Sequence, residues 1–281
     1  KLFRQGPKDI RLNDTKISQK ELIGTLNTVI FCPEDLQLIK GTPSGRRRFL
    51  DMEISQTSAT YYHQLMQYNR LLQQRNAVLK EYRGKNNIPL EEWDLQLADM
   101  ASFIVKKRLE SLKKINLLID LMNRKLTGGL ENLTIGYEQP YMENGSLEYT
   151  KEGFYERIKA ALPQDRHRLT TSVGPHRDDL RFFSDAMDLK KFGSQGQQRT
   201  AVLSLKLSEL EFIKSEVGEY PVLLLDDVLS ELDESRRANL LQFIHKRIQT
   251  FITTTDIHDF KDLKSVQFIS CEGGKVQYGQ P

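Results

Sequence analysis

The sequence predicts an α/β fold, in which a parallel sheet carries helices on its faces and a long all-α segment is inserted. Two patterns predict it. The C-terminal part alternates helical and strand-like segments, with helices expected over 200–215 and 234–247 and strands over 221–225 and 250–253. The middle, 46–126, has apolar residues at every third or fourth position, which is typical of amphipathic helices. With 281 residues, 38% of them hydrophobic, the chain can form one large domain or two smaller ones.

The segment that ends at Gly41 predicts short strands. Apolar residues around Ile10, at Leu22 and Ile23, and over 28–31 suggest these strands, with turn chemistry at Asn13-Asp14. Pro33 then begins a turn or a helix. This composition is typical of the end of an α/β lobe.

The middle segment predicts two long helices. One apolar stripe runs from Ile54 to Tyr82 and a second from Trp93 to Leu126, with a break at Pro89 between them. The two helices would form an antiparallel hairpin, and about 37 residues in each would give an arm of roughly 55 Å. An ordinary helical subdomain is an equal alternative to a projecting arm.

The segment after Gly129 is mixed. Alternation over 133–137 predicts a strand, 154–162 a short helix stopped by Pro163, and 169–173 a β-rich run. The chain closes with a hairpin, which is expected to pair 266–269 with 276–278.

The turn Ser194-Gln195-Gly196-Gln197 stands directly before an expected helix. A serine hydroxyl, backbone N–H groups and the positive end of the helix dipole would converge there on a site that fits a phosphate. The alternative is a capping box, in which Ser194 only caps the helix. In a capping box the Ser194 side chain accepts a hydrogen bond from the N–H of Gln197, and the Gln197 side chain accepts one from the N–H of Ser194.

The apolar run 222–225 ends in Asp226 and Asp227, as expected for a buried parallel strand that delivers carboxylates to its tip. Asp226 would hold Mg²⁺ through its water shell, and Asp227 would orient or polarise an attacking water. A strand ending in solvated turn residues is the alternative. Ser230 and Asp233 follow, and a plain helix cap competes with function for Asp233.

These motifs resemble those of ABC-type ATPases: Ser194 to Gln197 is similar to the signature, 222–227 to a Walker B strand and 230–233 to a D-loop. The segments 31–36, 45–51 and 174–179 resemble the RecF family of bacterial recombination mediators. The resemblance covers essentially the whole chain. It implies an ABC-type ATPase head with an inserted helical hairpin, related to the SMC and DNA-repair ATPases.

The resemblance also implies three parts. Residues 1–43 would be the remainder of an N-terminal ATPase lobe, 44–129 a helical, arm-like domain, and 130–281 the C-terminal ATPase lobe. The sequence contains no P-loop, since the pairs Gly84-Lys85 and Gly274-Lys275 are not followed by Ser or Thr. Residue 1 is Lys. The chain is therefore expected to be a C-terminal fragment whose P-loop lies upstream.

The family resemblance implies an ATP-dependent mediator that acts on single-stranded and gapped duplex DNA with RecR-like and RecO-like partners. ATP and Mg²⁺ would join two heads as a homodimer, with Ser194, Gly196 and Gln197 acting on nucleotide held by the partner. The sequence departs from ABC enzymes at Asp227, where Glu is usual, and at Thr255, where a histidine is usual and His258 falls three residues late. Slow hydrolysis is expected, because a shorter carboxylate positions water less well.

Two other functions compete with this one. The chain could be a structural or DNA-binding module with a vestigial nucleotide site. A transporter ATPase domain is disfavoured by the long insertion over 46–126 and the absent histidine.

The cations Arg46, Arg47 and Arg48 open the first long helix and are expected to contact DNA phosphates. One of them could instead pair with Asp51 or Glu53. Cations on the second long helix, Lys106, Lys107, Arg108, Lys113 and Lys114, are also expected to contact DNA phosphates, and for each lysine taken singly a solvated helix face is the better interpretation. His176 and Arg177 would support the nucleotide site or a lobe interface, with structural hydrogen bonding as the favoured alternative.

Composition excludes some classes. A net charge of +3 is too balanced to indicate nucleic-acid binding by itself. Two cysteines, Cys32 and Cys271, without ligand spacing argue against a disulfide scaffold and structural zinc. A reducing cytoplasm is expected, and no apolar run approaches the length needed to cross a membrane.

Overall fold

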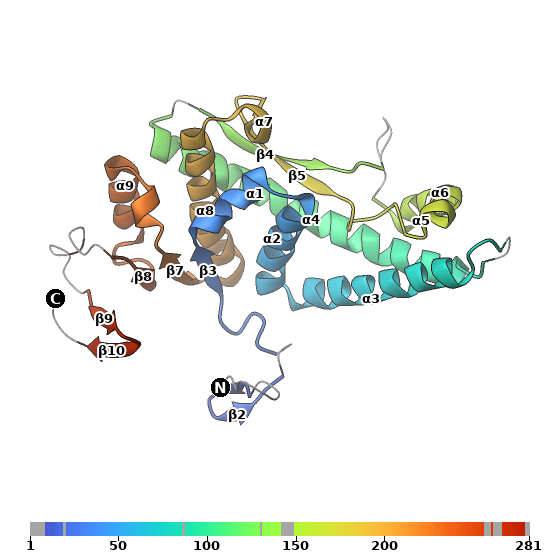
Figure 1. Ribbon diagram of the computed structural model, residues 1–281, viewed down its shortest axis with the longest axis horizontal. Helices are drawn as coiled ribbons and strands as arrows, with labels where there is room; N and C mark the ends of the chain where they lie inside the picture. The colour runs from blue at the N-terminus through green and yellow to red at the C-terminus, as the bar shows by residue number, and fades with distance from the viewer. Residues whose placement is uncertain are drawn as a thin grey trace.

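The computed structural model describes residues 9–18, 21–85, 88–129, 131–141, 149–255, 260 and 266–278. It has the mixed α/β architecture expected, with long helices between two small sheets (Figure 1). Among these residues, no helix is long and apolar enough to cross a bilayer.

A three-stranded parallel sheet lies at the centre of the predicted ATPase lobe. Its strands are β3 (Thr28–Phe31), β7 (Val222–Asp226) and β8 (Thr250–Thr253), in the order β3-β7-β8. Both pairings are parallel, which confirms the expectation drawn from alternating helices and strands. The helix α9 (Glu234–Ile244) makes the crossover from β7 to β8.

The long helix α8 (Gln195–Val217) packs against this sheet. It is buried on nearly every side, which is why its apolar residues show little helical periodicity in the sequence. The other face of the sheet is open: Ile30, Leu224 and Phe251 lie opposite one another in register, and Ile30 and Phe251 are 51% and 54% exposed.

The helical segment contains three helices where two were expected: α2 (Pro43–Thr57), α3 (Ala59–Glu81) and α4 (Glu91–Thr127). The prediction of one continuous helix up to Tyr82 is wrong because the chain is extended at Ser58, whose hydroxyl accepts a hydrogen bond from the N–H of Tyr61. This serine caps a new helix.

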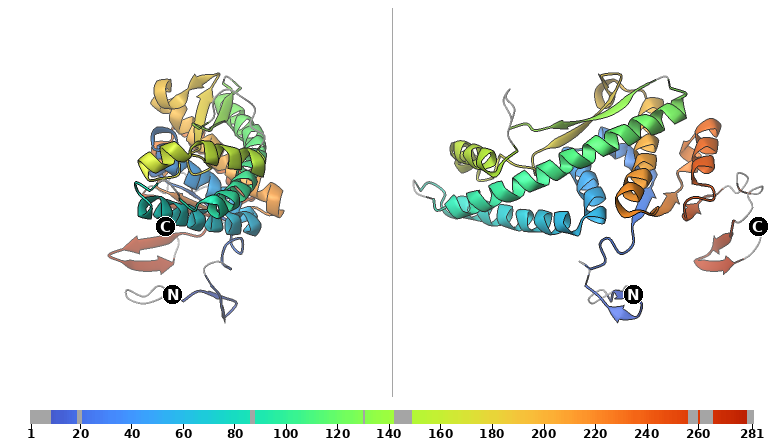
Figure 2. Two further views of the ribbon diagram at one scale, coloured as in Figure 1. Left: turned by 90° about the vertical axis from the view of Figure 1, so that its right-hand side faces the viewer. Right: turned by 180° about the vertical axis from the view of Figure 1, so that it is seen from behind.

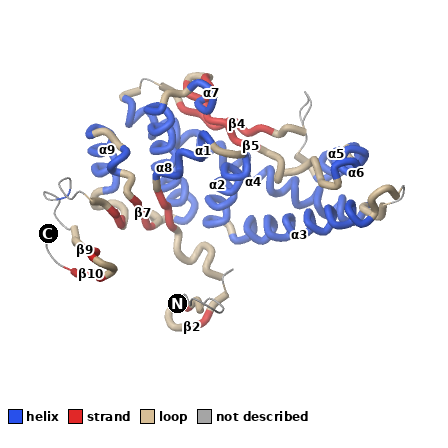
Figure 3. The backbone as a smooth tube through the Cα atoms, viewed as in Figure 1, coloured by secondary structure: helices blue, strands red, loops and turns tan. Residues whose placement is uncertain are grey.

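The helix α4 turns back along α3 and continues beside α8, β4 and α5 (Figures 1 and 3). It is therefore not free along its length, and the helical segment is packed onto the lobe by its C-terminal half. The helix ends at Gly128, as expected from the sequence.

A second sheet is antiparallel and consists of β4 (Leu133–Glu138), β5 (Asp179–Ser184) and β6 (Met187–Asp188). The helices α5 (Lys151–Ala160) and α6 (Leu162–Arg168) precede β5, and Pro163 lies in the first turn of α6 rather than ending a helix. The expected strand over 169–173 does not form, because side chains take up its backbone groups: Asn76 accepts from the N–H of Thr171, and Asp165 from that of Ser172.

The remaining short elements with bounds within the described residues are two hairpins and four helical turns. The strands β9 (Ile269–Glu272) and β10 (Lys275–Tyr278) pair around Gly273-Gly274, both with positive φ, which confirms the predicted hairpin and its turn. The prediction that its first strand runs over 266–269 is wrong, since this strand begins at Ile269. The strands β1 (Arg11–Leu12) and β2 (Thr15–Lys16) form the other hairpin, whereas Leu22 and Ile23 lie in a turn. The helical turns are η1 (Pro33–Leu36), α1 (Gln37–Lys40), α7 (Leu189–Phe192) and η2 (Leu229–Glu231).

One hydrophobic cluster joins the parts. It includes Val29 of β3, Ile54 of α2, Ile104 of α4, Phe182 of β5 and Leu205 of α8. The two views of Figure 2 show that α4 and α8 cross between the two sheets, so the helical segment and the lobe share a core.

Candidate nucleotide site

The predicted signature turn forms the N-terminus of α8. The Ser194 hydroxyl accepts a hydrogen bond from the N–H of Gln197 at 3.2 Å, and the Gln197 side chain accepts from the N–H of Ser194 at 3.0 Å. The capping box proposed as the alternative is therefore present. It leaves the hydroxyl proton of Ser194 without a partner in the described part of the chain, so capping and phosphate contact are compatible.

Gly196 faces open space. A Cβ built there would meet only the Ser194 Oγ at 4.0 Å, whereas a Cβ at Gly193 would come within 2.7 Å of the Leu189 carbonyl oxygen. The packing of the protein explains glycine at 193 but not at 196. Ser194, Gln195 and Gly196 are exposed, so the first N–H groups of α8 are accessible to an anion.

The predicted carboxylates lie at the tips of β7 and β8. Asp226 is exposed, and its Oδ1 accepts a hydrogen bond from the Thr253 hydroxyl at 2.6 Å. Asp227 is also exposed, has a φ of 52°, and donates its N–H to the Thr253 hydroxyl at 3.1 Å. Its carboxylate has no partner among the described residues.

Ser230 and Asp233 stabilise the turn that follows β7. The Ser230 hydroxyl donates to the carbonyl of Asp227 at 2.8 Å. Asp233 caps α9 by accepting from the N–H of Arg236 at 2.9 Å, and this bond lowers the pKa of the carboxyl group. The observed contacts of Asp233 are therefore those of a helix cap, the alternative interpretation of this residue.

The structure places these residues in two groups. Asp226, Asp227 and Ser230 come together with Thr253, while Ser194 to Gln197 lie at the start of α8, where Gln197 bonds Glu131 at 3.0 Å. No hydrogen bond or ion pair joins the two groups in the described part of the chain. In Figure 1 the first group lies toward α9 and the second beside α7.

The donor set at the tip of β7 fits Mg²⁺. This ion keeps several waters and takes one or two carboxylates together with phosphate oxygens. The described residues contain no cluster of three or more metal-ligating side chains, so a closed all-protein metal site is not formed there. Two exposed carboxylates, one of them unpartnered, match the magnesium pattern.

The structure corrects the prediction for Arg46. Its side chain is buried, at 3% exposure, and makes a two-pronged ion pair with Asp179 at 2.7 and 2.9 Å. This placement does not allow a DNA contact, and the partner is neither Asp51 nor Glu53. Arg47 is half-buried and donates to the carbonyl of Asp178 at 2.7 Å, while Arg48 is exposed.

A second buried arginine explains why Asp51 is unavailable to Arg46. Arg108 of α4 binds both carboxylate oxygens of Asp51, at 2.9 and 3.0 Å, and donates to the carbonyl of Pro175 at 2.8 Å. Asp178 lies 3.6 Å from its guanidinium and accepts a hydrogen bond from Tyr137. Arg108 thus ties α2, α4 and the turn before β5 together.

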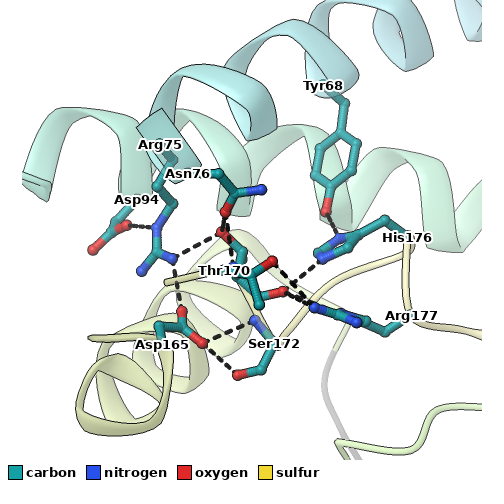
Figure 4. A network of polar contacts seen from close by, with 10 residues as sticks. Tyr68, Arg75, Asn76, Asp94, Asp165, Thr170, Ser172, His176 and Arg177 are labelled. Atoms are coloured by element: carbon teal, nitrogen blue, oxygen red, sulfur yellow. Dashed lines mark hydrogen bonds and ion pairs between the residues drawn. The ribbon is translucent and has the colours of Figure 1, made fainter. Parts of the chain in front are cut away.

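Arg75 forms the centre of a third buried network, shown in Figure 4. It is fully buried and pairs with Asp94 at 2.6 Å and Asp165 at 2.7 Å. Asp165 also accepts from the N–H and hydroxyl of Ser172. This network holds the loop over 169–173 against α3.

His176 and Arg177 belong to the same network and have structural partners. Both donate to the carbonyl of Thr171, and the His176 Nδ1 lies 2.6 Å from the Tyr68 hydroxyl (Figure 4). Since the Nε2 faces a carbonyl, it carries the proton and Nδ1 accepts from Tyr68. Burial lowers the pKa of His176 to about 4, so the ring is neutral. Structural hydrogen bonding, the favoured alternative, describes these contacts.

Sequence reasoning missed Arg75 and Lys206, and its expectation that Arg108 contacts DNA phosphates is wrong, because this arginine is buried and paired with Asp51. The amine of Lys206 on α8 lies 3.3 Å from both Asp35 and Glu209, close to the buried Glu53 of α2. Burial raises the pKa of Glu53 to about 7. Local patterns do not single out these residues, because most of their partners are distant in the sequence; the pair of Lys206 with Glu209, at i and i+3, is the local exception.

Comparison with known proteins assigns the family. No protein-family model matches the chain. It is 48% identical over 267 residues to the DNA replication and repair protein RecF of Alkaliphilus oremlandii, covering 94% of this chain and 73% of the relative. Identity to the RecF protein of Halothermothrix orenii is 45%, over 92% of this chain and 71% of the relative.

Solved structures agree. A structure of the recombination mediator protein RecF-ATP in the RecFOR pathway is 37% identical and matches with a TM-score of 0.85, covering 97% of this chain and 74% of that chain. Similarity of sequence and of structure thus extends over nearly the whole length of this chain and about three quarters of the length of its relatives. The chain belongs to the RecF family of DNA replication and repair proteins.

Proposed function

We propose that this chain acts in DNA replication and repair as an ATP-dependent recombination mediator, and that it contributes the signature turn and the Walker B strand of the ATP site. The observation that carries the proposal is Gly196, exposed beside the Ser194 hydroxyl at the start of α8, where the protein itself has no need of a glycine. The name of the RecF relatives supports the role in DNA replication and repair, and the solved RecF-ATP structure supports the choice of ligand.

The signature turn would bind nucleotide held by a second protomer. Ser194 can donate its hydroxyl proton and the first turn of α8 its N–H groups to a terminal phosphate, assisted by the helix dipole. The separation of this turn from the tip of β7 suits the arrangement, since each group would complete a different site. ATP would then stabilise a homodimer through charge-assisted hydrogen bonds that hydrolysis removes.

The tip of β7 would carry out hydrolysis. When bound, Mg²⁺ neutralises charge on the phosphates. Asp226 would hold this ion, and the unpartnered carboxylate of Asp227 would orient water. Because Asp227 is one methylene shorter than glutamate, we propose slow turnover and a two-state switch rather than a fast enzyme.

DNA and protein partners complete the proposal. Single-stranded and gapped duplex DNA would contact Arg47 and Arg48, which remain available after Arg46 is excluded by its ion pair with Asp179. The pathway named for the solved relative supports RecR-like and RecO-like partners.

The test joins the chain to a P-loop segment from a RecF relative and measures mass and DNA affinity with and without ATP. We expect ATP to produce a dimer and to tighten DNA binding. Ser194→Arg should abolish both effects, because the arginine fills the phosphate position. Gln73→Arg is the matched control, since it adds the same charge on an exposed site of α3.

The competing function is a DNA-binding module without a working nucleotide site. It is compatible with the observed helix-capping contacts of Ser194, Gln197 and Asp233, which need no nucleotide. Equal DNA affinity with and without ATP in the joined protein, unchanged by Ser194→Arg, would establish the binding module and refute the switch.

A further inference from the structure

A cavity of about 480 Å³ lies between α2, α3 and the turn that contains Pro175 and His176. Met52, Tyr62 and Leu65 form apolar walls. Its size falls in the range of small-molecule sites, about 300 to 1,000 Å³. The nucleotide site described above does not include it.

The arginines around the cavity differ in how their charge is balanced. Arg108 at the floor pairs with Asp51 and Asp178. Arg47 has only the carbonyl of Asp178 as a partner, and Arg48 has no hydrogen bond or ion pair in the described part of the chain. Neither of these two guanidinium groups therefore forms an ion pair with a carboxylate in the described part of the chain.

Other ionisable groups of the lining, His176 and Asp51, are engaged in hydrogen bonds with residues other than Arg47 and Arg48. His176 is neutral and hydrogen-bonded to Tyr68 and Thr171, and the Asp51 carboxylate is occupied by Arg108 and Tyr61. Burial and the nearby Arg108 lower the pKa of Arg47, whereas the neighbouring carboxylates of Asp179, Asp178 and Asp51 raise it by less. The cavity thus combines apolar and aromatic walls with two arginines that form no ion pair in the described part of the chain.

We propose that this cavity binds one unpaired nucleotide of a DNA strand, with the base against Met52, Tyr62 and Leu65 and the adjoining phosphate on Arg47 and Arg48. A simple anion would not need the apolar walls, and an apolar ligand would not need the arginines. Aromatic side chains stack on any base, and arginines bind phosphates in two-pronged geometry. The inference deepens the DNA-binding part of the proposed function and names the part of the strand that is recognised.

The experiment uses the chain as it is, without ATP, so that a failure of the ATP switch does not affect it. Anisotropy measures binding of a dT decamer and of an abasic decamer with the same phosphates. We expect the dT decamer to bind about 10-fold more tightly, since stacking is sequence-tolerant but requires a base. Tyr62→Ala should remove this preference and Tyr62→Phe, which keeps the ring, should retain it.

The phosphate contact is tested separately. Arg48→Glu should weaken binding of both decamers about 10-fold and reduce the salt slope by about one. Lys125→Glu makes the same charge change on an exposed site of α4 and should do neither.

Three outcomes would overturn the inference. The first is a full preference for dT in Tyr62→Ala. The second is equal behaviour of Arg48→Glu and Lys125→Glu. The third is a Tyr62→Trp reporter whose fluorescence is saturated by free dTMP but unaffected by the decamer, which would assign the cavity to a free mononucleotide.

Discussion

The tip of β7 and the network around Arg75 use similar residues in opposite ways. Asp226 and Asp227 are exposed and make few contacts, whereas Asp165 is fully buried and accepts bonds from Arg75 and Ser172. The same contrast separates Arg48, which is unpaired in the described part of the chain, from Arg46, which is saturated by Asp179.

This difference distinguishes charged residues that hold the fold together from charged residues that are available to bind a ligand. A buried charge must be paired, so a fully partnered arginine holds elements together and has no capacity left for a ligand. An accessible polar group without an internal partner contributes little to stability and is available for binding. Three predictions test this division.

The largest effect is expected in the Arg75 network. Arg75→Ala leaves Asp165 and Asp94 without their cation, and removing one partner of a buried pair costs about 3–5 kcal/mol. Urea unfolding would measure the loss. Lys107→Ala, which breaks an exposed pair with Glu110, is the control and should change stability by less than about 1 kcal/mol. A similar small loss in both variants would contradict the division.

The second prediction compares two glycines. Gly174 has a φ of 131°, and a Cβ there would come within 2.4 Å of the Tyr68 hydroxyl. Gly174→Ala should therefore cost about 1–3 kcal/mol from backbone strain alone. Gly196→Ala should leave thermal stability unchanged or slightly higher, because alanine favours helices, yet weaken ATP-driven dimerisation. Destabilisation by Gly196→Ala, or none by Gly174→Ala, would show that the environments are misassigned.

The third prediction concerns pH. Burial raises the pKa of Glu53 to about 7, well above the ordinary value for a glutamate, so the folded state retains a proton that the unfolded state releases. Its contribution to stability is complete below pH 4.5 and is lost as the pH rises to about 7.

The measurement is the free energy of unfolding of wild type and Glu53→Gln from pH 4.5 to 8. The glutamine cannot release a proton, so the variant should gain stability relative to wild type as the pH rises. His176 acts oppositely, since its lowered pKa makes stability fall with acidification, and it contributes equally to both proteins. A difference that does not vary with pH would refute the assignment.

Sequence reasoning predicted what local patterns encode. The parallel pairing of β7 and β8, the extent of α4 and the final hairpin all follow from apolar periodicity and turn residues. The position of Asp226 and Asp227 at a strand tip followed in the same way. These features depend on neighbours within a few residues.

Features that depend on distant partners were not predictable. Arg75 and Asp165 are 90 positions apart, and Arg46 and Asp179 are 133 apart. The loop over 169–173 has strand-forming residues, but tertiary bonds from Asn76 and Asp165 override that preference. A charged triplet such as 46–48 carries no local sign of which member is buried.

Because α4 is one continuous helix, a tilt at one of its ends displaces the other end. Asn123 meets α8 at Ser204, and Asp94 meets Arg75 near the opposite end. From Ile119 to Glu91 an α-helix spans about 42 Å, so a tilt of about 5° near α8 displaces the far end by about 4 Å. A rearrangement at the start of α8 that tilts α4 by this angle would therefore move the outer end of α3 and α4 by about 4 Å, roughly the distance between consecutive Cα atoms.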